Sequence, residues 1–492
     1  MKRYNQFFIK IIFTVFLTVL SLLGSARADQ PQALLIFHPE ITMQAMTGFG
    51  AGFNSDAYIN EIAKSQDRKL AYDLLYGPNS KGTELNIIRL VVPSTAQEIS
   101  KTSPLYAKNF KYDWSSDVNT QKMWNAIGPV LGMTKPIIYV VPFSPPVQWK
   151  RSIPSYLKDK NNNPNPNWGG SLDPSHNQDY AEYLADFLDY YHRVLGVEID
   201  VLSLQNEPGI AAKWPSCIWS GDELKTFIKI LKPAIHARGL KTKLMLSEGT
   251  AWSGAWNHLE PALLDPNALP LVDIMASHSY GQKYDQARAL FALASEKYKL
   301  PVWMSEMSLM IPPEQDDTTM KAALRVADYM HRDIYFGRAS AWIYCFSIFT
   351  YKFPGTMGLL APADKPGEEG KLIIPKRFWA MANYSQFVKP FWRVMKIEGS
   401  FDGAPLKDAN TTGFISPKGD GYVIVSVNPG GAAIKVTYNF GNWSIGKSVD
   451  SYCTSEEHNL TANVVPLMLE THSFTATVPP FSIVTFKGRF IH

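Results

Sequence analysis

The stretch 178–205, QDYAEYLADFLDYYHRVLGVEIDVLSLQ, contains the two kinds of element from which we expect this fold to be built. Its first part repeats large apolar side chains at helical spacing and stops at Gly196, which predicts an amphipathic helix. Its last part, 198-EIDVLSLQ, is a short apolar run, as is typical of a strand buried on both faces of a parallel sheet. The predicted helix buries the following side chains: Tyr180, Tyr183, Leu184, Phe187, Leu188 and Tyr191.

The same alternation of apolar runs and helical patterns extends from about Met46 to Gln386. Seven more short runs rich in Val, Ile and aromatic residues occur: 46-MTGFGAGFN, 84-ELNIIRLVV, 136-PIIYVVPF, 243-KLMLSEG, 272-VDIMASHSY, 301-PVWMSEM and 339-ASAWIYCFS. Helical patterns such as 318-TTMKAALRVADYMHRDIYFG separate them. Eight strands with intervening helices predict an α/β fold, a (β/α)₈ barrel, over residues 46–388.

The character of the chain changes after this region. Runs such as 422-YVIVSVN, 432-AAIKVTYNF and 481-FSIVTFKG have no helical period and are separated by Gly, Pro and Asn. They predict a side antiparallel β-sandwich domain over residues 389–492. The short segment 29–45 contains 33-ALLIF, which we expect to add a strand to that sandwich.

Residues 1–28 have the layout of a secretory signal peptide. A basic start is followed by an apolar run from Ile11 to Leu23 and then by Ala26-Arg27-Ala28, an Ala-x-Ala cleavage site. A membrane anchor is the alternative, but a run of about 13 residues at roughly 1.5 Å each is too short for a bilayer core of about 30 Å. We therefore expect cleavage near Ala28, a secreted protein, extracellular or periplasmic, and no stable membrane insertion afterwards.

Composition limits the partners of the 492-residue chain. Its formal net charge is +4, and the first 28 residues hold four basic side chains and no acidic one, so the remainder is close to neutral. This argues against capture of nucleic acid and favours a neutral partner. Cys217, Cys345 and Cys453 allow at most one disulfide and show no metal-ligand spacing, so we expect them to be structural. His278 has no matching cluster of Cys, His or Asp, so we expect no metal. We also expect no cofactor and a monomer.

Polar and aromatic side chains gather at the predicted carboxyl-terminal ends of the barrel strands, where barrels of this kind place functional groups. The residues we expect at this rim are Arg89, Trp149, Asn206, Glu207, Glu248, His278, Tyr280, Glu306 and Trp342. Hydrolysis of a glycoside needs a carboxylic acid and a carboxylate on opposite sides of the scissile bond. Glu207 and Glu306, after the fourth and seventh strands, can face each other across the barrel mouth.

The other rim residues have roles that suit a sugar substrate. Asn206 could bond a sugar 2-hydroxyl, Tyr280 could orient the carboxylate of Glu306, and Arg89 could keep that carboxylate ionised. Trp149 and Trp342 are the indoles that we expect to stack on sugar rings, and His278 is expected among the substrate-binding residues. Glu248 is an alternative nucleophile, although it follows a strand adjacent to that of Glu207 rather than one across the mouth.

Asn206-Glu207-Pro208 together with Glu306 resembles the clan A retaining glycosidases. More narrowly, 47-TGFGAGFN, 143-FSPPVQW, 203-SLQNEPG, 277-SHSYG and 303-WMSEM resemble glycoside hydrolase family 30, and 386-QFVKPFWRV and 479-PPFSIVTF resemble that family's return into its side β-sandwich. The resemblance implies that Glu207 is the acid/base and Glu306 the nucleophile of a double displacement.

The resemblance leaves the substrate open. It implies a carbohydrate partner, a β-linked polysaccharide, with xylan or glucuronoxylan favoured because 214-WPSCIW is most similar to the polysaccharide-acting members. Alternatives are a β-1,6-glucanase or galactanase and a glucosylceramidase. From a different class, a carbohydrate-binding protein without turnover would be expected to lack one of the two carboxylates.

Overall fold

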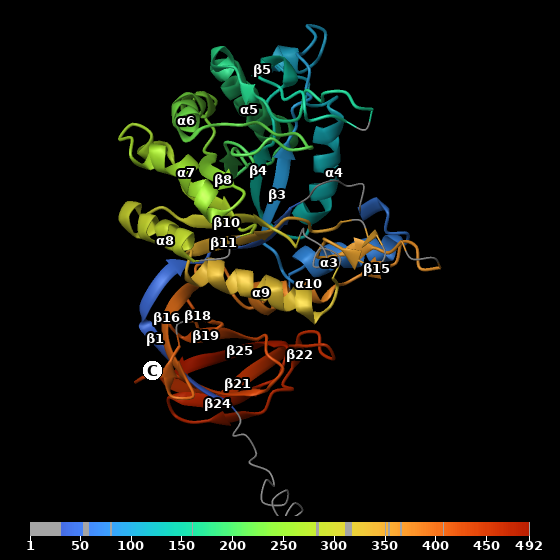
Figure 1. Cartoon of the computed structure of the whole chain (residues 1–492). Helices are drawn as coiled ribbons and strands as arrows, with labels where there is room; N and C mark the ends of the chain where they lie inside the picture. Colours follow the sequence, from blue (N-terminus) through green and yellow to red (C-terminus); the bar gives the residue numbers. More distant parts are fainter. Residues whose placement is uncertain are drawn as a thin grey trace, which may run out of the picture.

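A computed structural model describes residues 31–52, 59–78, 81–159, 161–281, 285–309, 317–349, 351–352, 355–364, 367–406 and 408–491. The predicted signal peptide lies outside these described residues. Within them, no helix has the length and apolar character needed to cross a bilayer. Figure 1 shows two parts, a barrel with its helices above and an orange and red sheet domain below.

Eight parallel strands close the barrel, in the order β10-β11-β2-β3-β4-β7-β8-β9. They are β2 (Gly48–Gly52), β3 (Ile87–Val92), β4 (Ile137–Pro142), β7 (Val201–Ser203), β8 (Lys243–Gly249), β9 (Ile274–His278), β10 (Val302–Met307) and β11 (Ala339–Tyr344). Each lies within one of the eight runs that the sequence predicts, so the barrel prediction is confirmed. Apolar side chains fill its centre: Ile87, Tyr139, Val141, Val201, Met245, Ile274, Ala276, Trp303, Ala341 and Ile343.

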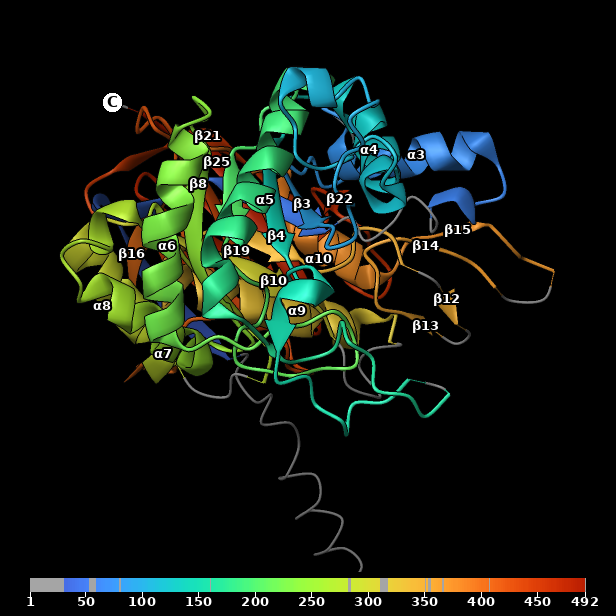
Figure 2. The same ribbon diagram turned by 90° about the horizontal axis from the view of Figure 1, so that it is seen from above.

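Helices surround the barrel strands, as Figure 2 shows from above for α4 to α8. The helices are α3 (Ser65–Tyr76), α4 (Val118–Leu131), α5 (Asn177–Tyr190), α6 (Gly221–His236), α7 (Trp252–Leu263), α8 (Gln286–Tyr298), α9 (Met320–Tyr335) and α10 (Lys376–Ser385). Helix α5 buries the aromatic face that its spacing predicts, and one further turn ends at Gly196 with a left-handed φ of 69°. Ser220 and Glu223 form a capping box at the start of α6.

The second part is one hydrogen-bonded sheet of eleven strands that folds over its own core. Its strands are β1 (Gln32–Ala45), β16 (Arg393–Phe401), β17 (Ala404–Pro405), β18 (Thr411–Ile415), β19 (Gly421–Asn428), β20 (Ile434–Asn439), β21 (Ser444–Thr454), β22 (Thr461–Ala462), β23 (Leu467–Leu469), β24 (Ser473–Val478) and β25 (Ser482–Ile491). The rings of Tyr422 in β19 and Phe440 just after β20 lie 4.6 Å apart, although three strands separate β19 from β20 in the sheet. Opposite halves of the sheet therefore face each other across a shared core, as in a sandwich.

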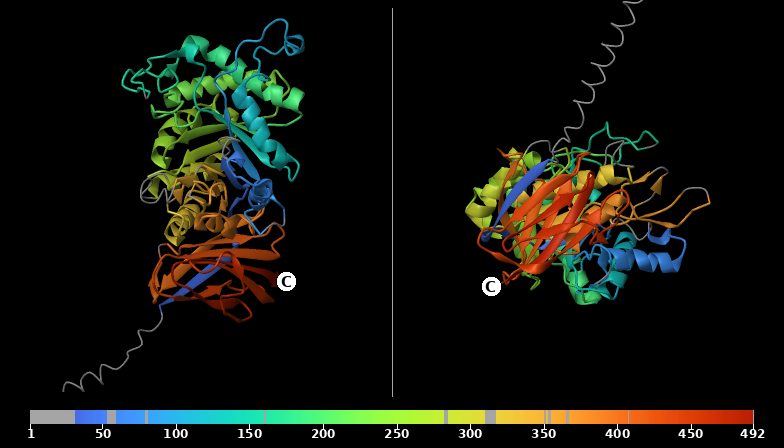
Figure 3. Two further views of the ribbon diagram at one scale, coloured as in Figure 1. Left: turned by 90° about the vertical axis from the view of Figure 1, so that its right-hand side faces the viewer. Right: turned by 90° about the horizontal axis from the view of Figure 1, so that it is seen from below.

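Strand β1 lies in the middle of this sheet. It pairs antiparallel with β16 and parallel with β20, so the sheet is largely but not wholly antiparallel. Figure 3 shows the blue β1 among the orange and red strands. The first strand of the described chain therefore completes a domain whose other strands come from its last quarter.

Helices α9 and α10 join the barrel to the sheet domain. The side chain of Asn383 in α10 donates to Thr454 at 2.8 Å and accepts from Thr485 at 2.9 Å. In α9, His331 bonds to Thr412 at 2.8 Å. Buried apolar side chains of β18, β19 and β25 belong to the same core as these helices. The sheet domain thus supports the barrel through a continuous packed interface.

Candidate active site

The polar residues predicted at the strand ends meet at the mouth of the barrel. Arg89 lies in β3, Glu248 in β8, His278 at the end of β9 and Glu306 in β10. Glu207 follows β7. Parallel strands of a closed barrel end at the same face, so residues far apart in the sequence gather there.

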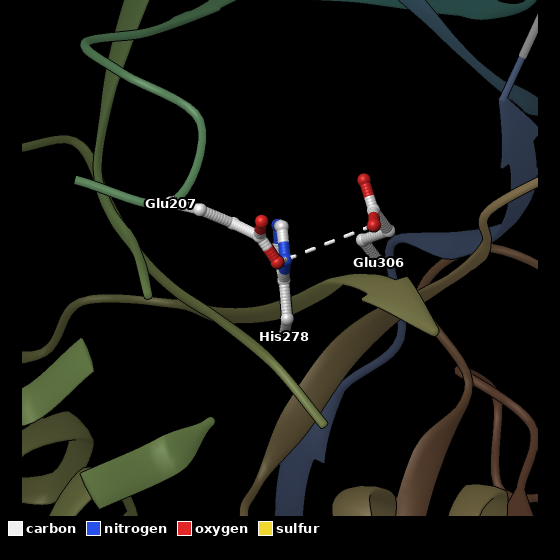
Figure 4. Close-up of side chains that lie close together, drawn as sticks. All are labelled: Glu207, His278 and Glu306. Carbon is white, nitrogen blue, oxygen red and sulfur yellow. Dashed lines mark hydrogen bonds and ion pairs between the residues drawn. The ribbon is translucent and has the colours of Figure 1, made fainter. Parts of the chain in front are cut away.

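Glu207, His278 and Glu306 form the centre of the site (Figure 4). One oxygen of each carboxylate and one ring nitrogen of His278 all lie within 4.8 Å of one another. His278 Nδ1 is 3.2 Å from Glu207 Oε1 and 3.9 Å from Glu306 Oε1. Glu207 and Glu306 approach the site from opposite sides, and the imidazole of His278 rises between them from below.

The backbone at Glu207 holds its side chain over the barrel mouth. Glu207 has a left-handed φ of 47°, which is uncommon for a residue with a side chain. Its N–H donates to the carbonyl of Glu248 at 2.9 Å, and that of Asn206 donates to the carbonyl of Pro142 at 2.9 Å. These bonds from the neighbouring strands fix the turn in a strained conformation, as is frequent at functional sites.

Glu306 is surrounded by groups that favour its charged form. Arg89 Nη1 lies 2.7 Å from Glu306 Oε2, and the Tyr280 hydroxyl donates to Oε1 at 2.8 Å. Burial alone would raise the pKa of Glu306, but the charges of Arg89 and His278 and the bond from Tyr280 outweigh it and hold the pKa below its usual value. Glu306 is therefore a carboxylate at neutral pH.

Glu248 is also ionised, but it lies below the site. It is fully buried, accepts a hydrogen bond from Tyr139 and lies 3.7 Å from Arg89 Nη2. Burial would raise its pKa, but Arg89 and His278 outweigh burial and bring the pKa to about 2. The partners of Glu248, namely Tyr139, Arg89 and His278, are all buried inside the barrel. Glu248 is therefore a fixed negative charge beneath the two facing carboxylates.

Arg89 connects the two sides of the site. Besides its ion pair with Glu306, it donates from Nη2 to Asn206 Oδ1 at 2.7 Å and from Nε to the Tyr139 hydroxyl at 3.0 Å. The Asn206 oxygen is thereby occupied, which leaves the amide N–H groups as the donors that this side chain can offer to a ligand.

Replacing Arg89 by Met should change the pH dependence of turnover and the stability together. Without the guanidinium the pKa of Glu306 rises, so the acidic limb of the kcat/KM profile should move up by about 1–3 pH units. Two buried carboxylates also lose their cation, which should cost about 3–5 kcal/mol in the free energy of unfolding. Lys396→Met, which breaks a pair with Glu398 in β16 whose two side chains are both about half exposed, is the control and should change neither quantity much. An unshifted acidic limb in folded Arg89→Met would contradict this role.

His278 is a buried imidazolium. Burial by itself would lower the pKa of His278. The charge of Glu306 and the bonds to Glu207 and Glu248 raise it by a larger amount, so that the pKa moves from 6.5 to about 9. Because the folded-state pKa exceeds the unfolded value, the stabilisation is complete below pH 6.5 and is lost as the pH rises toward 9. Urea unfolding at several pH values should show stability falling across this window, and His278→Asn should flatten the fall. An equally steep fall in His278→Asn would assign it to another group.

A cavity of about 750 Å³ opens above these residues. Five of the predicted site residues line it: Arg89, Asn206, Glu207, Tyr280 and Glu306. Glu248 and His278 are not among the lining residues. Much of the remaining wall is apolar: Val91, Val92, Met123, Ala126, Phe143, Ile210, Trp214, Pro215 and Phe346.

Three predicted substrate-binding residues require correction. Trp342 is fully buried on the helix side of β11, where its Nε1 donates to Asp333 at 3.0 Å. Trp149 is only 8% exposed and packs edge-on against Tyr183 with ring centroids 5.7 Å apart. His278 has no exposed surface and contacts the carboxylates from below rather than the cavity. Both indoles are packing residues, and the imidazole acts through its neighbours.

Two further cavity residues, Trp214 and Cys345, are not among the substrate-binding residues that the sequence predicts. Trp214, in the loop after Glu207, is 42% exposed and offers the ring that Trp149 and Trp342 do not. Its position close behind Asn-Glu-Pro was the available signal. Cys345 lines the floor, and burial raises the pKa of its thiol. Cys217, Cys345 and Cys453 are all free and buried.

Within the described residues, one group of side chains could hold a metal ion, namely Glu207, His278 and Glu306. The electrostatics of the group oppose a cation. Glu306 already pairs with Arg89 at 2.7 Å, and His278 is protonated below about pH 9, so it has no lone pair to offer. The prediction that no metal takes part stays a prediction, and this arrangement favours it.

Comparisons with known proteins relate this chain to glycosidases. A family model described as "O-Glycosyl hydrolase family 30" matches residues 92–358. The chain is 24% identical over 446 residues to the glucuronoxylanase XynC of Bacillus subtilis, covering 90% of this chain and 88% of that protein. Among solved structures it is similar to the catalytic domain of xylanase C from Talaromyces cellulolyticus, with a TM-score of 0.72, 19% identity and coverage of 93% and 100% of the two chains. An endo-β1,6-glucanase gives a TM-score of 0.68 at 18% identity, covering 92% of this chain and 93% of that one.

Proposed function

The chain belongs to O-glycosyl hydrolase family 30 and is a glycosidase, and from this we propose that it is a retaining β-glycosidase acting on a β-linked polysaccharide. One observation carries the mechanism: oxygens of Glu207 and Glu306 lie within 4.8 Å of each other at the edge of one cavity. Carboxyl groups about 5–5.5 Å apart suit a covalent intermediate, whereas about 6.5–9.5 Å would leave room for an attacking water.

The surroundings of Glu306 support the role of nucleophile, which leaves the acid/base role to Glu207, the second carboxyl group at the cavity. Glu306, ionised beside Arg89, attacks the anomeric carbon and forms a glycosyl ester. Glu207 gives its proton to the glycosidic oxygen as the aglycone leaves, then takes a proton from the water that hydrolyses the ester and so recovers its acid form. The net reaction adds one water across the glycosidic bond. An N–H of Asn206 bonds the sugar 2-hydroxyl, a contact that strengthens in the transition state.

Glu306 is preferred over Glu248 as the nucleophile because of where each oxygen points. Glu306 lines the cavity, while Glu248 is fully buried and accepts from Tyr139. A nucleophile must come within about 3–3.5 Å of the reacting carbon. Glu248 would have to leave its partners to do so.

Xylan or glucuronoxylan is the substrate we favour, supported by the named activity of the Bacillus subtilis relative, which aligns over 90% of this chain. β-1,6-Glucan is the second polysaccharide to test because an endo-β1,6-glucanase shares the fold. A glycolipid such as glucosylceramide is a further candidate, because apolar side chains such as Val91, Met123 and Phe346 line the cavity beside the carboxylates.

A panel of substrates with product sizing tests the proposal. Purified protein is incubated with xylan, glucuronoxylan, β-1,6-glucan, β-1,6-galactan and an alkyl β-glucoside, and the products are sized by chromatography. Proton NMR of the first product follows the anomeric configuration. Release of products that first appear as the β-anomer supports the proposal; first appearance of the α-anomer would overturn retention.

We also propose that the protein is exported, on the basis of the signal-peptide layout of residues 1–28. Expression in a secreting host, followed by amino-terminal sequencing, should give a mature chain that begins near Asp29. An unprocessed chain retained in the cytoplasm would contradict this.

A further inference from the structure

Lys150 holds its charge in an unusual setting. Its ammonium donates to Ser144 Oγ at 2.9 Å, to the carbonyl of Asn167 at 3.0 Å and to the carbonyl of Ser216 at 2.9 Å. These three neutral acceptors match its three N–H donors. Among the described residues, no carboxylate forms an ion pair with it. Burial lowers the pKa of Lys150 to about 8, so its desolvation has a cost that a surface lysine would not bear.

The acceptors of Lys150 belong to two separate connections of the barrel. Ser144 and Asn167 lie in the connection after β4. Two parts of this connection, residues 143–149 and 165–172, are here called the β4 loop. Ser216 lies in the connection after β7, and the β7 loop is defined here as residues 208–219. Lys150 itself begins β5 (Lys150–Arg151), which pairs with β6 (Ser171–Leu172).

The two loops are closely joined around the ammonium. Ser216 N–H donates to the carbonyl of Asn167 at 3.1 Å, and Ile218 N–H donates to that of Gly170 at 2.7 Å. Gly169 N–H donates to Ser216 Oγ at 2.9 Å. Gly169 has a φ of 64°, and a Cβ there would lie 2.9 Å from the Ala211 side chain, so this close approach requires glycine.

The joined edge of the two loops is one wall of the cavity. Ser144 and Asn167 of the β4 loop line it, as do Ile210, Trp214 and Pro215 of the β7 loop. Trp214 stands on this wall with 42% of its surface exposed. Lys150 is not a lining residue, so it reaches the cavity only through the loops that it holds.

We propose that Lys150 is a positioning residue for glycan binding, because its ammonium clamps the β4 loop to the β7 loop and thereby sets the wall that carries Trp214. The proposal rests on the proposed function in naming a glycan as the ligand of that wall. The carboxylates have separate supports: Glu207 N–H is held by the carbonyl of Glu248, and Glu306 by Arg89 and Tyr280. Loss of the clamp should therefore weaken glycan binding more than it slows cleavage of the glycosidic bond.

The test compares Lys150→Met with a matched control. Met keeps the length of the side chain and removes the ammonium. On the β-glycan that wild type cleaves fastest in the panel, Lys150→Met should raise KM about tenfold and leave kcat within about threefold, the pattern for loss of uniform binding. The control is Lys376→Met: Lys376 donates to the carbonyls of Ser455 and Glu456 at 2.6 and 2.7 Å, and so holds a loop of the sheet domain in the same way. It should leave KM unchanged.

Hydrogen exchange gives a readout that needs no substrate. In Lys150→Met, amides of 167–172 and 210–219 should exchange at least about tenfold faster than in wild type, as expected when a local opening becomes easier. If Lys150→Met does not fold, Ser216→Ala, which removes the acceptor of Gly169 N–H, should show the same two changes at about threefold.

Each outcome has a definite meaning. A wild type that cleaves no member of the panel counts against the proposed function, while the exchange measurement still judges the clamp. Unchanged exchange in both segments overturns the clamp, whatever the kinetics. Faster exchange with unchanged KM overturns its role in glycan binding, as does an equal rise of KM in Lys376→Met.

Discussion

Replacing Glu306 by alanine is expected to lower kcat by about 10⁴-fold or more, the scale seen when an enzyme loses its covalent nucleophile. The structure gives the reason in this chain. Glu306 lines the cavity as a carboxylate beside Arg89, and its oxygen lies within 4.8 Å of an oxygen of Glu207. With that carboxylate gone, Glu207 is the one carboxyl group left among the described lining residues, so none of these can form the glycosyl ester from the side of Glu306, and water must attack without help.

Azide should restore turnover of Glu306→Ala on an activated aryl β-glycoside. The small anion can occupy the space that the carboxylate leaves and attack the anomeric carbon, so the product should be the α-glycosyl azide, with inverted configuration. The matched variant is Glu248→Ala, which removes a buried carboxylate from beneath the same site and should lose stability without gaining azide rescue. Rescue of Glu248→Ala, and not of Glu306→Ala, would exchange the two assignments.

Replacing Glu207 by glutamine should lower kcat/KM by about 10²–10⁴-fold for substrates with poor leaving groups, the usual contribution of a general acid. Glutamine keeps the shape of the side chain but has no proton to give. For a dinitrophenyl β-glycoside, whose leaving group needs no protonation, kcat/KM should stay within a few-fold of wild type. The comparison uses kcat/KM because this ratio includes only the steps through formation of the ester.

The pattern across leaving groups decides the role of Glu207. A plot of log kcat/KM against leaving-group pKa should be steep for Glu207→Gln and shallow for wild type. Asn206→Ala, a change in the neighbouring residue, should lower kcat/KM for all leaving groups alike, because its amide contacts the sugar rather than the aglycone. Equal loss for good and poor leaving groups in Glu207→Gln would remove it from the acid/base role.

The sequence could predict the barrel because buried parallel strands are visible as apolar runs of limited length. Once the strands are known, the geometry of a closed parallel barrel places their final residues at one face. That is enough to predict that Arg89, Glu207, Tyr280 and Glu306 lie together, although they come from β3, β10 and the turns after β7 and β9.

Side-chain direction was harder to predict. In β11, Ala341 and Ile343 fill the barrel centre while Trp342 between them faces the helices. Both faces of such a strand are apolar, so the pattern does not indicate which positions turn inward. Trp149 lies in a short 3₁₀ turn, where side-chain direction depends on tertiary packing, and there it joins the aromatic cluster around Tyr183.

The contacts of Lys150 could not be predicted from the sequence at all. Two of its acceptors are main-chain carbonyls, and these belong to segments about 17 and 66 residues away. Every residue has a carbonyl, so no choice of residue type marks the acceptors. His278 is similar: its sequence neighbours indicate a place at the rim, but its complete burial against Glu207 and Glu306 depends on how the strands pack in three dimensions.

The central place of β1 in the sheet domain has a consequence for how the protein is made. Ala33 pairs with Phe401 and Val436, so β1, which precedes the barrel in the chain, meets its partners only after the whole barrel has been synthesised. Until then the buried side chains of Leu35 and Phe37 have no core to enter, and contacts between such distant segments form slowly. Nascent chains should therefore depend on chaperones that shield this strand, and ribosomes that stall after the barrel should release protein prone to aggregate.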